Sequence, residues 1–170
     1  GDTGVTVDGT SVIGGPSTGA ITTGAVTLAN GASLTVGTGV ASPISIASLL
    51  GTAGGAGETV TLNSTSAVAV TGDIGATGNA LTALTLTQSG GASFGGATTA
   101  DTVTIVDTAT GQTVDFVGDT TIGNRLFVQA GTADYNLSLR GTTTSIAGTT
   151  TFLNGGTLNL GDAAGDSLTF

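Results

Sequence analysis

The sequence predicts an all-β fold, a parallel β-helix (β-solenoid) with about 20–22 residues per coil. Apolar and small polar residues alternate with period two in many short runs, which is typical of half-buried strands. Gly, Asn or Asp bounds each run and supplies the turns. Similar runs return after about twenty residues, as expected when each period forms one turn of a solenoid.

The alternating runs are expected to be strands, because Val, Ile, Leu and Thr dominate them. In chain order the runs are VTV at 5–7, AVTL at 25–28, SLTV at 33–36, TVTL at 59–62, AVAV at 67–70, LTLT at 84–87, TVTIV at 102–106, VDFV at 114–117, NLSL at 136–139, TLNL at 157–160 and SLTF at 167–170. The segment PISIASLLG at 43–51 is the sole helix candidate, and its β-branched residues favour a strand there too.

The spacing of apolar residues indicates the length of one coil. Phe116, Leu137 and Leu158 lie 21 residues apart, and Ile146 and Leu168 lie 22 apart. One such period contains three short runs, LSLRG, TSIAG and TTFLNG, each with a Gly at its end. Three short strands per coil favour a parallel β-helix over a sandwich, and the chain has room for about eight coils.

The whole chain, residues 1–170, is predicted to be one solenoid domain. Its coils are expected to be regular over 81–170 and less regular over 1–80. The segments GTAGGAGE at 51–58 and TGDIGATGNA at 71–80 interrupt the period, either as loops extruded from coils or as a change of coil shape.

Composition limits the core and the partners. With 31 Gly, one Tyr, five Phe and no Trp, the chain can build only a thin core of Val, Leu and Ile. Arg125 and Arg140 are the only basic residues, and the formal charge is -9. We expect both Arg side chains to be counter-charges to neighbouring Asp residues. Nucleic acid is excluded as a partner because its binding depends on basic side chains, and no apolar run is long enough for membrane insertion as a helix.

The chain lacks Cys and His, which excludes disulfides and thiolate metal sites and removes the usual general base. Paired carboxylates for glycoside hydrolysis are conceivable at Asp107 with Asp115, or at Asp115 with Asp119. We favour turn formation by these Asp residues, and only two Arg are available to take the proton that lyase chemistry removes. The protein is therefore expected not to be an enzyme.

Calcium is the one cofactor that the sequence favours enough to consider. GDAAGD places Asp162 and Asp166 on one loop, and GDTTIGN places Asp119 near Asn124, so that oxygen ligands gather as Ca²⁺ prefers. Hydrated turns explain the same residues and are the interpretation we favour, since no intact GGxGxDxUx nonapeptide occurs. Divalent cations that bridge subunits would reduce the repulsion between acidic copies.

Thr-x-Thr motifs occur at 85–87, 102–104, 142–144 and 149–151, in the manner of the flat Thr arrays of ice-binding solenoids. Such an array needs one pair per coil on the same face, and the spacings of 17, 40 and 7 residues do not provide it. We therefore interpret these Thr residues as ordinary outward-facing strand residues.

The segment 114–170 carries the elements TTFLNGGTLNLG and GDxxxDSLTF, and its apolar runs recur with a period of about 21 residues. It resembles repeats of large secreted bacterial surface proteins of the filamentous-haemagglutinin and autotransporter-adhesin type, over about a third of the chain. The resemblance implies an extracellular right-handed β-helix used for adhesion, a surface layer or a matrix fibre. It supplies no catalytic residues.

We therefore expect a secreted or cell-surface structural subunit that stacks head to tail with copies of itself into a fibre of a biofilm matrix or surface layer. The interface would pair Leu168 and Phe170 of the last coil with Val5 and Val7 of the first coil of another copy. The alternative is a segment of a large adhesin that binds carbohydrate or a host surface, with Phe170 leading into a further coil. The N-terminus lacks the pattern of a signal peptide, which we expect to be removed or outside this segment.

Overall fold

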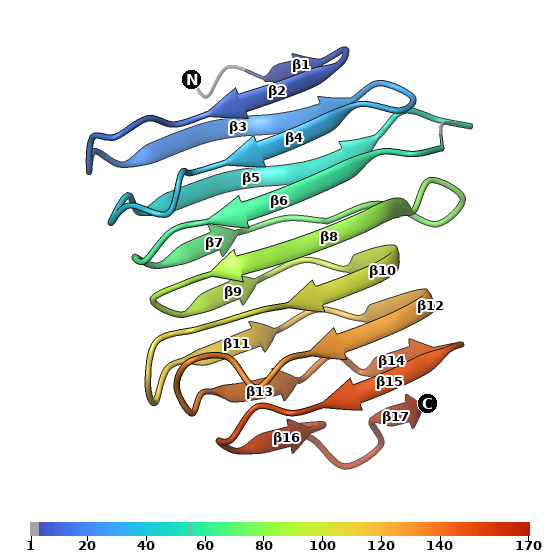
Figure 1. Ribbon diagram of the computed structural model, residues 1–170. Helices are drawn as coiled ribbons and strands as arrows, with labels where there is room; N and C mark the ends of the chain where they lie inside the picture. The colour runs from blue at the N-terminus through green and yellow to red at the C-terminus, as the bar shows by residue number, and fades with distance from the viewer. Residues whose placement is uncertain (1–3, 55) are drawn as a thin grey trace.

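The computed structural model describes residues 4–54 and 56–170, which form a solenoid of stacked parallel strands (Figure 1). In chain order the strands are β1 (Val5–Val7), β2 (Thr10–Ile13), β3 (Ile21–Leu28), β4 (Ser33–Val36), β5 (Ile44–Gly51), β6 (Thr59–Asn63), β7 (Val68–Val70), β8 (Leu81–Gln88), β9 (Ala92–Phe94), β10 (Thr98–Ile105), β11 (Thr113–Phe116), β12 (Thr120–Val128), β13 (Asn136–Leu139), β14 (Thr143–Ile146), β15 (Thr149–Phe152), β16 (Leu158–Leu160) and β17 (Ser167–Thr169). The predicted all-β fold is confirmed, and the segment 43–51 forms a strand.

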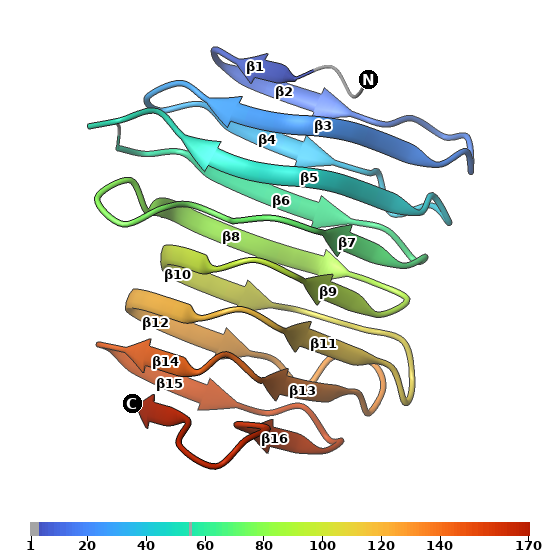
Figure 2. The same ribbon diagram turned by 180° about the vertical axis from the view of Figure 1, so that it is seen from behind.

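The strands pair only with their counterparts one coil away, which produces two sheets along the solenoid. One sheet has the order β1-β3-β5-β7-β9-β11-β13-β16, and the other has the order β17-β14-β12-β10-β8-β6-β4-β2, with β15 also paired to β12. Figure 1 shows the second sheet in front, and Figure 2, turned by 180°, shows the first sheet in front. Within the described residues the model contains no helix, and thus none that could cross a membrane.

Each coil contains up to three strand segments, because the longer strands bend around a corner. The first residues of β12 pair with β14, and its last residues pair with β15. Between these parts, Gly123 and Asn124 lie opposite the single residue Asp101 of β10, which is a β-bulge. In the next coil the counterparts of β11 and of the two parts of β12 are three separate strands, β13, β14 and β15. The prediction of three short strands per coil is confirmed there.

The coil is longer than the sequence predicts. The solenoid has about seven turns of about 23 residues, whereas the spacing of apolar residues predicts 20–22 residues and eight coils. The offset between paired residues varies from 19, for Leu84 and Val103, to 26, for Ser33 and Thr59. Because the turns differ in length, residues at a fixed sequence spacing are not always stacked. Leu137 does pair with Leu158, but Phe116 pairs with Leu139.

The same drift affects the last coil. Leu168 pairs with Thr144 rather than with Ile146, two residues from the expected partner. The 22-residue spacing of Ile146 and Leu168 therefore does not mark the coil length.

The N-terminal half is also built of coils in continuous register. The strands from β1 to β7 follow one another in the stack without a break. Residues 52–54 and 56–58 leave the coil as a loop, as do residues 75–80, where Ala76 and Asn79 form an antiparallel bridge. The backbone N–H of Gly54 donates to Asn79 Oδ1 at 2.9 Å, so the two loops are bonded to each other. The two predicted interruptions are thus extruded loops, with Gly55 outside the described residues.

Inward-facing apolar residues stack one above another to form the core. One column runs through Ile46, Val70, Phe94, Phe116 and Leu139, all of which are buried. The rings of Phe94 and Phe116 have centroids 4.9 Å apart. Val, Leu and Ile make up most of the remaining core, as the composition predicts.

One corner of the solenoid is lined by glycine. Gly72, Gly96, Gly118 and Gly141 follow β7, β9, β11 and β13, one in each of four successive coils. A Cβ atom on Gly118 would lie 2.3 Å from the carbonyl oxygen of Gly96, and one on Gly141 would lie 2.4 Å from that of Gly118. No other residue type fits this corner without moving the backbone of the neighbouring coil apart.

Candidate functional site

The predicted interface residues lie at the two ends of the solenoid. Val5 and Val7 belong to β1 in the first coil, and Leu168 lies in β17 of the last coil, followed by Phe170. Val7 is almost fully buried because its side chain points into the core, whereas the Phe170 side chain is 51% exposed. The Phe170 ring meets the Phe152 ring edge to face, with centroids 6.0 Å apart.

The last coil exposes side chains at positions that are buried in the coils from β5 to β13. Leu158 and Leu160 continue the inward-facing columns of Leu137 and Leu139, which are fully buried. Leu160 is nevertheless 44% exposed, because no coil covers it in this structure. The end of the stack is therefore an apolar surface with an unpaired strand edge around it.

The predicted calcium ligands Asp162 and Asp166 form a hydrogen-bonded turn. Asp166 Oδ2 accepts hydrogen bonds from the backbone N–H of Asp162 at 2.7 Å and of Ala163 at 2.9 Å. These bonds, that from Ala163 first, hold the pKa of the Asp166 carboxyl below its usual value. Asp162 Oδ2 lies 3.8 Å from a guanidinium nitrogen of Arg140. The geometry accounts for both residues through the turn and a weak ion pair.

The other predicted pair, Asp119 and Asn124, lies at the start of β12 and in its bulge. Asp119 Oδ1 accepts a hydrogen bond from the backbone N–H of Thr143 in the next coil at 2.9 Å. Over residues 4–54 and 56–170, no three acidic side chains come close enough together to hold a metal ion. A Ca²⁺ ion here would need backbone carbonyls and water for most of its ligands.

The carboxylates considered for glycoside hydrolysis bind protein groups instead. Arg140 Nε donates to Asp115 Oδ1 at 2.9 Å, and its Nη2 donates to Asp115 Oδ2, across neighbouring coils. This bidentate pair confirms Arg140 as a counter-charge and raises the pKa of its guanidinium. The expectation for Arg125 is wrong: its guanidinium lies over the Phe127 ring, 4.2 Å from the centroid, and none of the ion pairs found in the described chain includes it.

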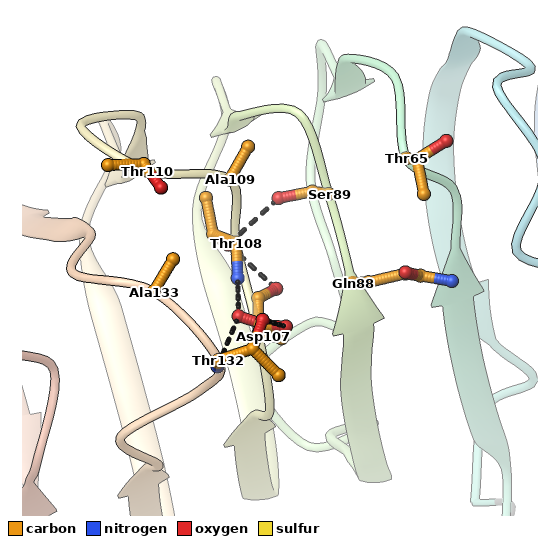
Figure 3. Close-up of a pocket in the computed structure, with 9 residues that line it drawn as sticks. All are labelled: Thr65, Gln88, Ser89, Asp107, Thr108, Ala109, Thr110, Thr132 and Ala133. Atoms are coloured by element: carbon orange, nitrogen blue, oxygen red, sulfur yellow. Dashed lines mark hydrogen bonds between the residues drawn. The ribbon is translucent and has the colours of Figure 1, made fainter.

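The best-formed pocket surrounds Asp107, where β10 ends and the chain turns towards β11 (Figure 3). Its volume is about 280 Å³. The residues that line it come from four successive coils and are mostly small and polar: Thr65, Gln88, Ser89, Asp107, Thr108, Ala109, Thr110, Thr132 and Ala133. Asp107 Oδ2 accepts a hydrogen bond from the Thr132 hydroxyl at 2.6 Å, and Oδ1 accepts from the backbone N–H groups of Thr108 and Thr132.

The Asp107 carboxylate ties two coils together, and the hydroxyls around it offer hydrogen bonds to a small polar ligand. Ser89 and Thr108 share a hydrogen bond of 2.9 Å between their hydroxyl oxygens. Sequence reasoning favours Asp107 as a turn former and does not find its contact with Thr132, because Thr132 is 25 residues away and the contact depends on the coil register. Comparisons with protein-family models, with curated proteins and with solved structures found no match.

Tyr135 packs behind this pocket and gives a direct test of the core there. Its side chain is fully buried, and its hydroxyl donates to the backbone carbonyl of Gln129 at 2.6 Å. Burial raises the pKa of Tyr135 from 10.0 to about 12, and the negative charge of Asp107 adds to the shift. The folded state therefore favours the neutral phenol.

We expect Tyr135 to titrate near pH 12 in the folded protein and near pH 10 after denaturation. Since the folded pKa is the higher one, the phenol's contribution of about 3 kcal/mol to the free energy of unfolding is complete below pH 10. It is lost as the pH rises from 10 to 12. The chain has one Tyr and no Trp, so near-ultraviolet absorbance follows this group alone. A folded-state midpoint at pH 10 would contradict the burial, and Tyr135→Phe supplies the blank.

Proposed function

We propose that this protein is an extracellular structural β-solenoid, a subunit that stacks head to tail into a fibre of a biofilm matrix or surface layer. The observation that carries the proposal is the apolar end of the stack, where Leu160 continues the column of the buried Leu139 and is nevertheless 44% exposed, and where the Phe170 side chain is 51% exposed. A further parallel coil placed over them would bury these side chains and pair the open strand edge, which is β-augmentation.

A head-to-tail contact joins two different surfaces, so it does not close into a ring and produces filaments. In the proposed contact, the last coil with Leu168 and Phe170 pairs with the first coil around Val5 and Val7 of another copy. Each copy would add about seven coils, or about 34 Å at about 4.8 Å per coil. The net charge of -9 opposes this association, and we expect salt or Ca²⁺ to promote it by reducing repulsion.

The test is negative-stain electron microscopy of the 170-residue chain at increasing concentration, with Ca²⁺ and with a chelator. We expect filaments, and we expect Leu160→Asp to abolish them because it places a charge on the apolar end. The control, Ser45→Asp, adds the same charge at an exposed position on the side of the solenoid and should leave the filaments intact. Single rods at every concentration in the unmodified chain would overturn the fibre proposal.

The second candidate is a segment of a large adhesin that binds carbohydrate, with the stack continued by coils of the same polypeptide. The pocket at Asp107 favours this function, because a carboxylate and several hydroxyls gather at the entrance to a volume of about 280 Å³. A glycan array separates the two candidates. Binding that is lost in Thr132→Val, by a chain that stays monomeric, would support the adhesin; filaments without glycan binding would support the fibre.

A further inference from the structure

The second sheet, which contains β4, β6, β8 and β10, presents a regular array of hydroxyl groups to solvent. Its outward-facing residues on β4, β6, β8 and β10 lie in two columns, one residue per coil in each. The first column contains Ser33, Thr59, Ala83 and Thr102, and the second contains Thr35, Thr61, Thr85 and Thr104. We call these eight residues the hydroxyl face. Seven of the eight carry a hydroxyl, and all are partly exposed.

The motifs visible in the sequence do not reveal this face. Thr102 and Thr104 belong to the hydroxyl face. The motif at 142–144 does not, because residues 143–146 form β14 and Thr144 is buried in the core. Both Thr residues of the TVT at 59–61 belong to the face. On β8 the second column contains Thr85 and the first contains Ala83, so that Thr87 is not one of the eight residues. The inference that these four motifs do not stack once per coil is confirmed, since only 102–104 lies whole in the hydroxyl face. The face is built mostly from other residues, because turns of different length bring unequally spaced residues into register.

The array has two fixed repeats. Adjacent parallel strands are about 4.8 Å apart, and residues i and i+2 of one strand are about 6.6 Å apart on the same side. The register across β4, β6, β8 and β10 is continuous at all eight positions. Thr59 Oγ1 donates to Ser33 Oγ at 3.0 Å, so these two hydroxyls also order one another. Such a surface complements a partner that is itself periodic in two dimensions.

No charged side chain lies on the hydroxyl face. The chain has eleven acidic residues and two Arg, yet none of them occupies any of the eight positions. The first charge along the first column is Arg125, which pairs with Thr102 and covers the Phe127 ring. The hydroxyl face of this acidic protein is thus neutral, as are the outward-facing Thr22, Ser45, Ala69 and Ser93 of the other sheet, and its complementary partner is uncharged.

We propose that the hydroxyl face binds ice. Each Thr offers a hydroxyl that donates and accepts hydrogen bonds with water, beside a methyl group that limits how that water turns. Ordered at fixed repeats, such groups hold surface water in a lattice that an ice crystal can continue. Sugar polymers are a poorer fit, because the eight positions include no aromatic ring to stack on a sugar and no amide or acidic side chain. This binding needs only one copy of the chain and is independent of the proposed fibre.

Arg125 and Phe127 mark the limit of the array. Beyond them the pattern returns at Thr149 and Thr151, which pair with Arg125 and Phe127. Replacing both residues by Thr would therefore add the coil of β12 to the hydroxyl face and join it to Thr149 and Thr151 in the coil beyond. The lattice would then extend over six coils instead of four. We expect this double variant to bind ice more strongly than the unmodified chain.

The experiment measures thermal hysteresis and the shape of single ice crystals, using the full chain with Leu160→Asp so that it stays monomeric. We expect a measurable freezing gap and faceted crystals. Thr85→Lys should reduce the gap to that of buffer, because the side chain stands at the centre of the second column. Ser45→Lys, on another side of the solenoid, should leave it unchanged. Circular dichroism and thermal melting show that each variant is folded.

Three results would overturn the proposal. The first is the absence of thermal hysteresis in the folded chain with Leu160→Asp. The second is equal loss of the gap in Thr85→Lys and Ser45→Lys. The third is binding to crystalline cellulose or chitin that Thr85→Lys abolishes while ice crystals grow unhindered, which would assign the face to a polysaccharide. A larger gap in Arg125→Thr with Phe127→Thr supports ice binding by a route that does not depend on loss of function.

Discussion

Replacing Phe116 by alanine is expected to lower the free energy of unfolding by about 3–5 kcal/mol. Phe116 is buried between Phe94 and Leu139 in the same inward-facing column, and its ring centroid lies 4.9 Å from that of Phe94. Truncation leaves a cavity that the neighbouring coils cannot close, because their backbones are fixed by parallel hydrogen bonding on both sides. Denaturation in urea or guanidinium, followed by circular dichroism, measures the loss.

The adjacent residue provides the control for this prediction. Val117 follows Phe116 directly, and its side chain is 37% exposed. Val117→Ala should change the free energy of unfolding by about 0.5 kcal/mol or less, since it removes little buried area. Similar losses in the two variants would mean that Phe116 is not in a packed core. Because a solenoid is stabilised by contacts between neighbouring coils, amides around β11 should also exchange faster in Phe116→Ala.

The sequence predicts the fold class because the local signals all agree. Period-two alternation, closing glycines and the near-regular return of apolar runs each favour a stack of short strands, and the structure contains one. Even the doubtful segment 43–51 forms β5. Whether a strand residue faces the core or the solvent can be predicted from local sequence alone, because the two directions alternate along the strand.

Register was harder to predict, because it depends on the lengths of turns. The 21-residue spacing of Phe116 and Leu137 looks like one coil, but Phe116 pairs with Leu139. The loop before β6 adds several residues to one coil, giving the offset of 26 between Ser33 and Thr59. No local pattern indicates how many residues a turn contains. The alternation within strands is therefore predicted correctly, whereas the alignment of residues between coils is not.

The same limit explains what was missed at the sites. Asp107 is recognisable as a turn former, but its contact with Thr132 requires the coils to be aligned. Arg140 is expected from the sequence to be a counter-charge to an Asp, but its partner Asp115 and the bidentate geometry are set by the stacking of one coil on the next. The hydroxyl face is invisible in the sequence for this reason, although every residue in it is an ordinary strand residue.

The glycine corner leads to the second large effect. Gly118→Ala is expected to lower the free energy of unfolding by about 3 kcal/mol, which is a large loss for the addition of one methyl group. The new Cβ atom would lie 2.3 Å from the carbonyl oxygen and 2.4 Å from the carbonyl carbon of Gly96. These are backbone atoms, so a change of rotamer cannot relieve the clash, and the two coils must move apart. Chemical denaturation measures the effect.

Gly19→Ala is the matched control, because no atom outside its chain neighbours lies within 4 Å of the added Cβ and its φ is not positive. That variant should be neutral or slightly stabilising, since alanine restricts the unfolded chain more than glycine does. In Gly118→Ala the separation of the coils should weaken the hydrogen bonds on either side of the corner, from Val117 N–H to Phe94 and from Arg140 N–H to Phe116. Faster exchange of those two amides, with unchanged exchange in β3 and β4, would locate the damage at the corner. If Gly118→Ala proved as stable as Gly19→Ala, the coils would not be in contact there, and tight stacking could not be the reason for glycine at Gly72, Gly96 and Gly141.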